Sequence, residues 1–595
     1  MKKSSFACLI SSWVTHFLLF FAMVVFVINS RVYPYADDWA YLSPLSMHSM
    51  SEYFNWLMVQ HVDHRIPIQK ALHSFLGEKV GFDFRVLVFL NVLFALLTSI
   101  VLTASAHMYR GSRHFGDIII PLIVMSPVMG YSLWAFQFQF LSSIFFVSTS
   151  FYFFCRYIKS GNVAFHSLAL TQLFLCALCG MNGVIFSSVL IILVASFSLV
   201  KHRYTLKLNV LSLLLICLVF LENVFIWLLW TPSAASSGIT NISSLLECFF
   251  KLLPASMVVY TFSNAIWNIG FVLVGLLLAA YGLYRAVRNE GLSYILLIAA
   301  AIITATLALV ASAAIARSKA AGDWDNTLIM HYGFLTVLLP IFSWIIISKY
   351  CQKKITVVFG VVAVIVFTSA YFDNYKWRYE FANSTQDKQR IIANALKEND
   401  DVRDIVEKFN RDFTWSDSYD AKQAVVVGLE ELRQFNFPIY SLLSSSNNSS
   451  NEITGSSRKA IDDYYDSLPM LATRPVACKG SLDVLNKISP APNMVTTEGT
   501  LDASGWLLAG AGVADNIYLV LSNAQGVRKF FRVNVYERPD VSKYFNDKKL
   551  LMSGFSASLD LSTMQGLYTL EFAIRKNNIF TACENIRSTI SIGKQ

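Results

Sequence analysis

Charged residues are scarce in this chain. Of its 595 residues, 15% are Asp, Glu, Lys or Arg, whereas 55% are hydrophobic. Soluble domains carry roughly 25% charged residues, so the composition excludes an ordinary soluble protein and indicates that most of the chain lies in lipid. The net charge of +9 could suggest an anionic partner, but in membrane proteins such an excess more often reflects basic cytoplasmic loops. We expect no nucleic-acid partner.

Nucleotide-binding and zinc-binding motifs are also missing. There is no P-loop and no Gly-rich dinucleotide fingerprint, which argues against a nucleotide-dependent reaction. Cys176 and Cys179 lie in an apolar run without ligand partners at zinc-like spacing. Cys478 and Cys583 flank the C-terminal region. In an oxidising compartment we expect a disulfide between these two, with two free thiols as the alternative.

Long apolar runs are what the chain has in abundance. We count eleven segments of about 20 residues that could span a membrane. They lie near 9–29, 84–106, 117–134, 138–155, 165–180, 183–200, 207–230, 257–284, 292–315, 327–348 and 355–372. With Met1 inside, every inside loop is basic, as the positive-inside rule requires. The pattern predicts a cytoplasmic N-terminus and a C-terminal region on the outside.

The polarity of the chain changes along its length and predicts four regions. Residues 1–372 hold the spans, including a long first outer loop in which we expect one or two short interfacial helices. Residues 373–440 read as a soluble helical segment, and 441–472 as a Ser/Asn-rich linker. Residues 473–595 alternate apolar and polar residues around turns, which predicts a small β-sandwich. The expected fold is therefore a mainly α polytopic bundle with a C-terminal β-sandwich domain.

Polar residues gather on the predicted outer side, where the membrane makes them costly. The candidate site residues are Asp37 and Asp38, His64 and Arg65, Gln137 and Gln139, and Arg317, His331 and Tyr332. Cations at this face suit the binding of an anionic lipid headgroup. A carboxylate next to them suits the removal of a proton from a hydroxyl group.

Each of these residues has a plainer interpretation. Either aspartate can cap the helix that follows it. His64 and Arg65 can form a solvated helix face, and Gln137 and Gln139 an ordinary polar turn. Arg317 can end a span and reach the interface, and His331 can be a satisfied buried histidine.

The segments "ADDW", "HRIP", "FQFQ" and "AIAR…HYGF", with an acidic pair just after the first span, resemble a family. They are similar to GT-C type membrane glycosyltransferases, and within these to bacterial enzymes that glucosylate O antigen. The resemblance covers residues 1–372. Related sequences tend to have Arg-Tyr where this chain has His331 and Tyr332. The C-terminal segments "YERPDVSKYF" and "SGFSASLDLS" look like accessory domains of surface-glycan enzymes.

The resemblance implies an inverting hexosyltransferase of the bacterial inner membrane. It would move a hexose such as glucose from a polyprenyl-phosphate carrier to a surface polysaccharide such as O antigen of lipopolysaccharide. Asp37 would be the general base and Asp38 would orient the acceptor or a metal, while Arg317 with His64 or Arg65 would hold the carrier phosphate. A divalent cation, Mg²⁺ or Mn²⁺, is left open. Its implied partners are a polyprenyl-phosphate glycosyltransferase and a flippase that supply the donor.

Three alternatives belong to other functional classes. A flippase or transporter for a lipid-linked sugar would need polar groups along a path through the bilayer, and most spans here are apolar. An O-antigen ligase or polymerase would use the same lipid phosphate. A receptor that senses through the C-terminal domain would leave the polar residues of the outer face without a role.

Overall fold

The computed structural model describes two compact units, Met1–Ser446 and Asn447–Gln595. The described residues are 3–593 except 202–209, 232–241, 258–261, 318–331, 399–401, 415–418, 435–477 and short stretches of the second unit at 487, 490–491, 493, 498–499, 510–511, 514–515, 524–527, 562–563 and 577–578. The predicted linker 441–472 lies outside the described residues.

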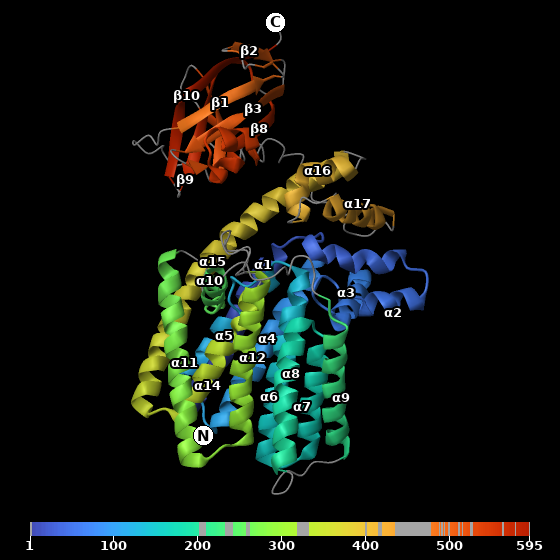
Figure 1. Cartoon of the computed structure of the whole chain (residues 1–595), viewed down its shortest axis with the longest axis vertical. Coiled ribbons are helices and arrows are strands. Elements are labelled where there is room, and N and C mark those ends of the chain that lie inside the picture. The colour runs from blue at the N-terminus through green and yellow to red at the C-terminus, as the bar shows by residue number, and fades with distance from the viewer. Residues whose placement is uncertain are drawn as a thin grey trace. The chain divides into compact units, whose positions relative to one another are not determined.

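The first unit is a helical bundle (Figure 1). Its helices are α1 (Lys3–Ile28), α2 (Met50–Met58), α3 (Pro67–Lys79), α4 (Phe84–Arg110), α5 (Ile119–Val124), α6 (Phe138–Ser160), α7 (Val163–Ala177), α8 (Met181–Lys201), α9 (Val210–Leu228), α10 (Ile242–Leu252), α11 (Phe262–Glu290), α12 (Tyr294–Arg317), α14 (Leu338–Tyr350), α15 (Lys353–Glu398), α16 (Val402–Phe413) and α17 (Tyr419–Gln434). The 3₁₀ helices are η1 (Ala36–Ser46), η2 (Phe115–Ile118), η3 (Gly130–Ser132), η4 (Ala135–Gln137) and η7 (Gly333–Thr336).

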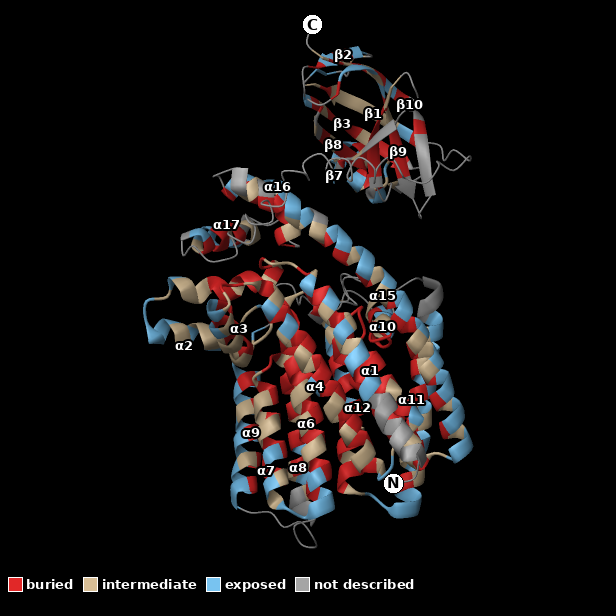
Figure 2. Cartoon of the chain, turned by 180° about the vertical axis from the view of Figure 1, so that it is seen from behind, coloured by how far each residue is buried: buried red, intermediate tan, exposed pale blue. Residues whose placement is uncertain are grey.

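Seven of the described helical stretches are long and apolar enough to cross a membrane, and four shorter apolar helices accompany them. Each of the eleven predicted segments overlaps one of these helices, and seven of the eleven overlap a helix long enough to cross a membrane. The first unit therefore has several helices that could span a membrane, as in a multi-pass membrane protein. Buried residues concentrate in the middle of the bundle, as Figure 2 shows.

The third predicted span, 117–134, differs from the expectation. Its helix α5 has six residues, and the chain then continues through short 3₁₀ turns to α6. Irregular backbone is tolerated at membrane depth only where protein satisfies its polar groups. Here the side chains of Asn91 and Arg378 donate to the carbonyls of Trp134 and Ser132, at 3.0 and 2.9 Å. We name residues 125–137 the buried turn segment.

The first outer loop contains the two short helices that were expected, α2 and α3, after η1. They lie at one end of the bundle (Figure 1). The loop is fastened to the start of α4, where the Phe84 amide donates to the Val32 carbonyl at 3.1 Å. It is also fastened to the end of α9, where Trp230 Nε1 donates to the Asp63 carbonyl at 3.1 Å.

Helix α15 runs unbroken through the predicted domain boundary at residue 372. The helical segment after it belongs to the first unit, because α16 and α17 pack back onto the outer loop. Trp39 Nε1 donates to the Phe413 carbonyl at 3.1 Å. A Cβ atom at Gly428 of α17 would lie 2.4 Å from the Trp39 ring, so only glycine permits this close approach.

The second unit consists of two five-stranded sheets, ordered β1-β3-β8-β7 with β4 beside β3, and β2-β10-β9-β5-β6. The strands are β1 (Cys478–Leu485), β2 (Met494–Thr497), β3 (Thr500–Ala509), β4 (Gly512–Val513), β5 (Asn516–Asn523), β6 (Arg528–Arg532), β7 (Asn534–Tyr536), β8 (Gly554–Asp560), β9 (Gly566–Lys576) and β10 (Ile579–Ile592), with helix α20 (Pro539–Tyr544) and turn η8 (Lys548–Ser553). Both sheets contribute to one apolar core, where the Phe555 and Phe572 rings lie 4.7 Å apart. A disulfide joins Cys478 to Cys583 and thereby β1 to β10.

Candidate functional site

Asp38 is a buried structural residue. Its side chain is 2% exposed and accepts two backbone N–H bonds, from Phe136 at 2.7 Å and from Tyr35 at 3.2 Å. The bond to Tyr35 caps the start of η1, so the capping interpretation applies to this residue. The bond to Phe136 holds the outer loop against the buried turn segment. Burial, opposed by these hydrogen bonds, raises the pKa of Asp38 well above its ordinary value.

The side chain of the neighbouring residue, Asp37, lies in different surroundings. Its carboxylate Oδ1 lies 3.4 Å from His61 Nε2, and the two side chains are 20% and 23% exposed. This is the one hydrogen-bonding contact of Asp37 among the described residues. Asp37 Oδ2 therefore stays available to a ligand.

Backbone strain occurs on both sides of this pair. Ala36 and Val62 have φ of +53° and +51°, a region that residues with a Cβ atom seldom adopt. Ala36 precedes Asp37, and Val62 follows His61 in a tight turn closed by two hydrogen bonds between His61 and His64. Strained residues cluster at functional sites, so the strain marks the Asp37–His61 pair as a candidate site.

His64 and Arg65 have separate roles in the same turn. His64 Nδ1 accepts the backbone N–H of Met181 at 3.3 Å. Burial lowers the pKa of His64 to about 4, and the nearby charge of Arg317 acts in the same direction. The Arg65 guanidinium donates to the carbonyls of Met58 at 2.6 Å and Leu229 at 2.9 Å. Arg65 therefore joins the end of α2 to the residue after α9.

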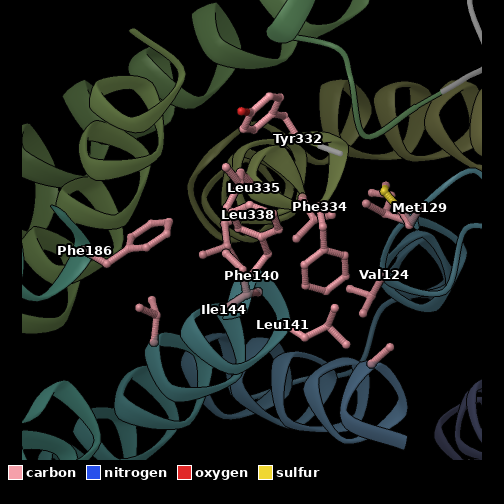
Figure 3. Close-up of a cluster of buried hydrophobic side chains, with 14 of the residues drawn as sticks. Val124, Met129, Phe140, Leu141, Ile144, Phe186, Tyr332, Phe334, Leu335 and Leu338 are labelled. Carbon is pink, nitrogen blue, oxygen red and sulfur yellow. The ribbon is translucent and has the colours of Figure 1, made fainter. Parts of the chain in front are cut away.

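Arg317 and Tyr332 lie together beside this turn. Arg317 Nε donates to the Tyr332 hydroxyl at 2.7 Å. No other hydrogen bond of Arg317 is found within the described ranges, so its two terminal nitrogens can bind an anion. In Figure 3 the Tyr332 ring lies at the edge of an apolar cluster with Phe140 and Phe334, and its hydroxyl points away from them. The cluster fixes the ring, and the ring positions the guanidinium.

The glutamines of the "FQFQ" segment are not an exposed polar turn. Gln137 and Gln139 are each 1% exposed at the start of α6. Phe140 beside them contacts both His64 and Tyr332, with ring centroids 6.2 Å away in each case. The structure thus brings Asp37, His64, Gln139, Arg317 and Tyr332 into one region. His331 lies outside the described residues.

Two residues near this region were missed by the sequence reasoning. Asn182 and Gly180 lie at the turn between α7 and α8, beside His64 and Gln139. The stretch "CGMNG" placed glycines and an amide between two apolar runs on the predicted outer side, and this was the available signal.

A metal at Asp38 does not fit this arrangement. Both carboxylate oxygens of Asp38 already accept backbone N–H bonds. In the described part of the chain, no three His, Cys, Asp or Glu side chains are grouped closely enough to hold a metal ion. Among the described residues, the region instead offers a carboxylate and a guanidinium with further hydrogen-bonding capacity, and buried amide groups.

The chain matches no protein-family model, and it matches none of the curated proteins.

Proposed function

We propose that this protein is a membrane glycosyltransferase of the GT-C type. It would transfer a hexose, such as glucose, from a polyprenyl-phosphate carrier to a surface polysaccharide on the outer side of a bacterial inner membrane. Eleven crossings, a cytoplasmic N-terminus and an outer β-sandwich domain belong to this proposal. The carrying observation is that, within the described residues, Asp37 presents an unpaired carboxylate oxygen in the same region as the unpaired terminal guanidinium nitrogens of Arg317.

In this reaction Asp37 Oδ2 takes the proton from the acceptor hydroxyl. The acceptor oxygen then bonds to the anomeric carbon as the bond from that carbon to the phosphate oxygen breaks. The phosphate leaves with the electron pair, and a single displacement of this kind inverts the anomeric centre. General-base catalysis contributes about 10²–10⁴-fold to the rate.

The leaving phosphate needs positive charge and hydrogen-bond donors. Arg317 supplies both, because a guanidinium binds phosphate with parallel N–H donors. Its orientation is set by Tyr332, which accepts from Arg317 Nε. His61 Nε2 lies 3.4 Å from Asp37 Oδ1 and orients the carboxylate.

The test is transfer by the full chain in membranes, measured by mass analysis of the surface glycan in a deletion strain complemented with each variant. Asp37→Asn should lower transfer by about 10²-fold or more, with normal protein in the membrane fraction. The matched control is Asp83→Asn, because Asp83 caps α4 and pairs with Arg85 in the same loop. Transfer near the wild-type level by the Asp37→Asn protein would show that Asp37 is not the general base.

A further inference from the structure

Three polar groups converge on the backbone of Gly180. An ideal Cβ atom at this position would lie 3.2 Å from Asn182 Oδ1, 3.3 Å from Gln139 Oε1 and 3.3 Å from His64 Nδ1. Gly180 has φ +96°, so glycine suits the backbone here as well as the space. We name Gln139, Gly180 and Asn182 the amide subsite.

All three converging atoms are hydrogen-bond acceptors. Asn182 directs Oδ1 into the subsite because its Nδ2 donates to the Gln139 carbonyl and to Ser143 Oγ. His64 Nδ1 already accepts from the Met181 amide, so it is not free to donate from that atom. A ligand that enters here has to bring donors.

The two amide oxygens receive no hydrogen bond from the described part of the chain. Among the residues that the structure describes, Asn182 Oδ1 and Gln139 Oε1 are buried without a hydrogen-bond partner, and their residues are 2% and 1% exposed. A buried acceptor without a partner costs about 1–3 kcal/mol, so such an atom is usually satisfied by an ordered water or by a ligand. Two such atoms that lie together beside Gly180 indicate a place where one incoming donor group could satisfy them.

We propose that the amide subsite binds hydroxyl groups of the donor's sugar. This inference rests on the proposed function and names the residues that recognise the sugar by hydrogen bonds. The subsite borders the phosphate-binding residues, since His64 contacts Phe140 and Phe140 contacts Tyr332. A sugar hydroxyl is a neutral donor, which matches two neutral amide acceptors. A divalent cation matches them poorly, because the subsite has no carboxylate.

The experiment measures binding of two kinds of lipid to the full chain in nanodiscs. The affinity for bare polyprenyl phosphate measures the phosphate contact of Arg317. The affinities for polyprenyl-phosphate hexoses (glucose, galactose, mannose and N-acetylglucosamine) add the contribution of the sugar. We expect wild type to bind one hexose lipid about tenfold tighter than the bare lipid, as two neutral hydrogen bonds permit. Asn182→Leu should lose about threefold to tenfold for that hexose lipid and nothing for the bare lipid. Arg317→Ala should weaken both.

Two further variants guard against misfolding. Gln139→Met removes the second acceptor with a side chain of similar length and should act as Asn182→Leu does. The matched control is Asn223→Leu. Asn223 is also a buried amide, but it donates to Ser187 within the apolar helix α8 and is not part of the amide subsite. The control should leave the preference for the hexose lipid unchanged, and unfolding midpoints without lipid show which variants fold.

The outcomes separate the two proposals. If wild type binds neither lipid, the proposed function fails. If it binds the bare lipid as tightly as every hexose lipid, the inference is overturned and the phosphate site stands. The inference is also overturned if Asn182→Leu weakens the binding of both lipids equally, or if it keeps the wild-type preference for the hexose lipid.

Discussion

At the scale of single residues, Asp37 and Asp38 are joined by one peptide bond and lie in different surroundings. Asp38 is buried and accepts backbone N–H bonds, whereas Asp37 is half-buried and faces His61. The 3₁₀ backbone of η1 turns successive side chains to different sides of the chain. An acid pair in a sequence can therefore combine a structural residue and a candidate reactive one.

The candidate site was predictable in its members more than in their roles. Asp37, His64, Gln139, Arg317 and Tyr332 were selected because polar groups beside membrane spans are costly, and they lie in one region. Arg65 satisfied the same rule and instead binds two carbonyls. Free helix ends need donors wherever they are buried, and the sequence does not say which cation serves a helix end and which serves a ligand.

Asp38→Asn should destabilise the outer loop. An asparagine replaces one accepting oxygen with an NH₂ group, which then faces a backbone N–H donor. An unsatisfied buried pair of this kind costs about 1–3 kcal/mol. We expect a lower unfolding midpoint for Asp38→Asn in detergent by scanning fluorimetry, while Asp37→Asn unfolds near the wild-type temperature. Equal midpoints for the two variants would contradict the structural role of Asp38.

Acid should destabilise the outer loop through His73. His73 of α3 is fully buried, and its ring stacks on that of Tyr41 in η1. Burial lowers the pKa of His73 from 6.5 to about 4. The unfolded chain therefore binds a proton below pH 6.5 that the folded chain refuses until about pH 4. Stability is complete above pH 6.5 and is lost as the pH falls through this window, by about 2 kcal/mol at pH 5.

The measurement is the difference in unfolding midpoint between pH 7.5 and pH 5.0. His73→Phe keeps an aromatic ring and cannot titrate, so its difference should be smaller than that of wild type. The control His48→Gln changes an exposed histidine of the same loop and should keep the wild-type difference. A His73→Phe protein with the full acid effect would show that other groups cause it.

At the scale of elements, apolar runs predicted where helices lie but not how long each one is. Residues 117–134 have the composition of a span, yet the run includes Pro121, Pro127 and Gly130, and the helix stops at Val124. Helix α15 shows the opposite case, since it continues beyond its apolar part to Glu398. Both lengths depend on tertiary partners, because Arg378 of α15 bonds the buried turn segment that replaces the missing helix.

The disulfide should stabilise the second unit against unfolding. It closes a loop with a sequence separation of 105 residues and joins strands of different sheets. In the chain-entropy model a loop of this size contributes about 4–5 kcal/mol. The double variant Cys478→Ser/Cys583→Ser should therefore be cleaved faster by protease within residues 478–593 than wild type.

Alkylation tests the bond itself in protein isolated from the envelope. Without a reductant, Cys478 and Cys583 should resist a maleimide reagent. After reduction both should be labelled, which shows that the reagent reaches them. Labelling of both C-terminal cysteines before reduction would show that the bond is absent in cells.

At the scale of the whole bundle, charge separates along the helix axes. Helix α4 begins against Val32 near the candidate site and ends at Arg110, about 40 Å away at 1.5 Å per residue. Arg110 bonds Ser348 at 2.9 Å, and Lys349 lies 4.1 Å above the Tyr109 ring, so α4 and α14 end together. The basic helix ends and the candidate site therefore occupy opposite ends of the bundle.

This separation predicts the orientation in the membrane, because basic residues remain on the cytoplasmic side. A periplasm-only reporter enzyme fused after Ser446, where the first unit ends, should be active. The same reporter fused after Ser160, at the basic end of α6, should be inactive, and a cytoplasm-only reporter should give the reverse pair. Both fusions must be present at equal levels in the membrane fraction. If the reporter is active after Ser160 and inactive after Ser446, the site faces the cytoplasm, and an acceptor on the outer face could not reach Asp37.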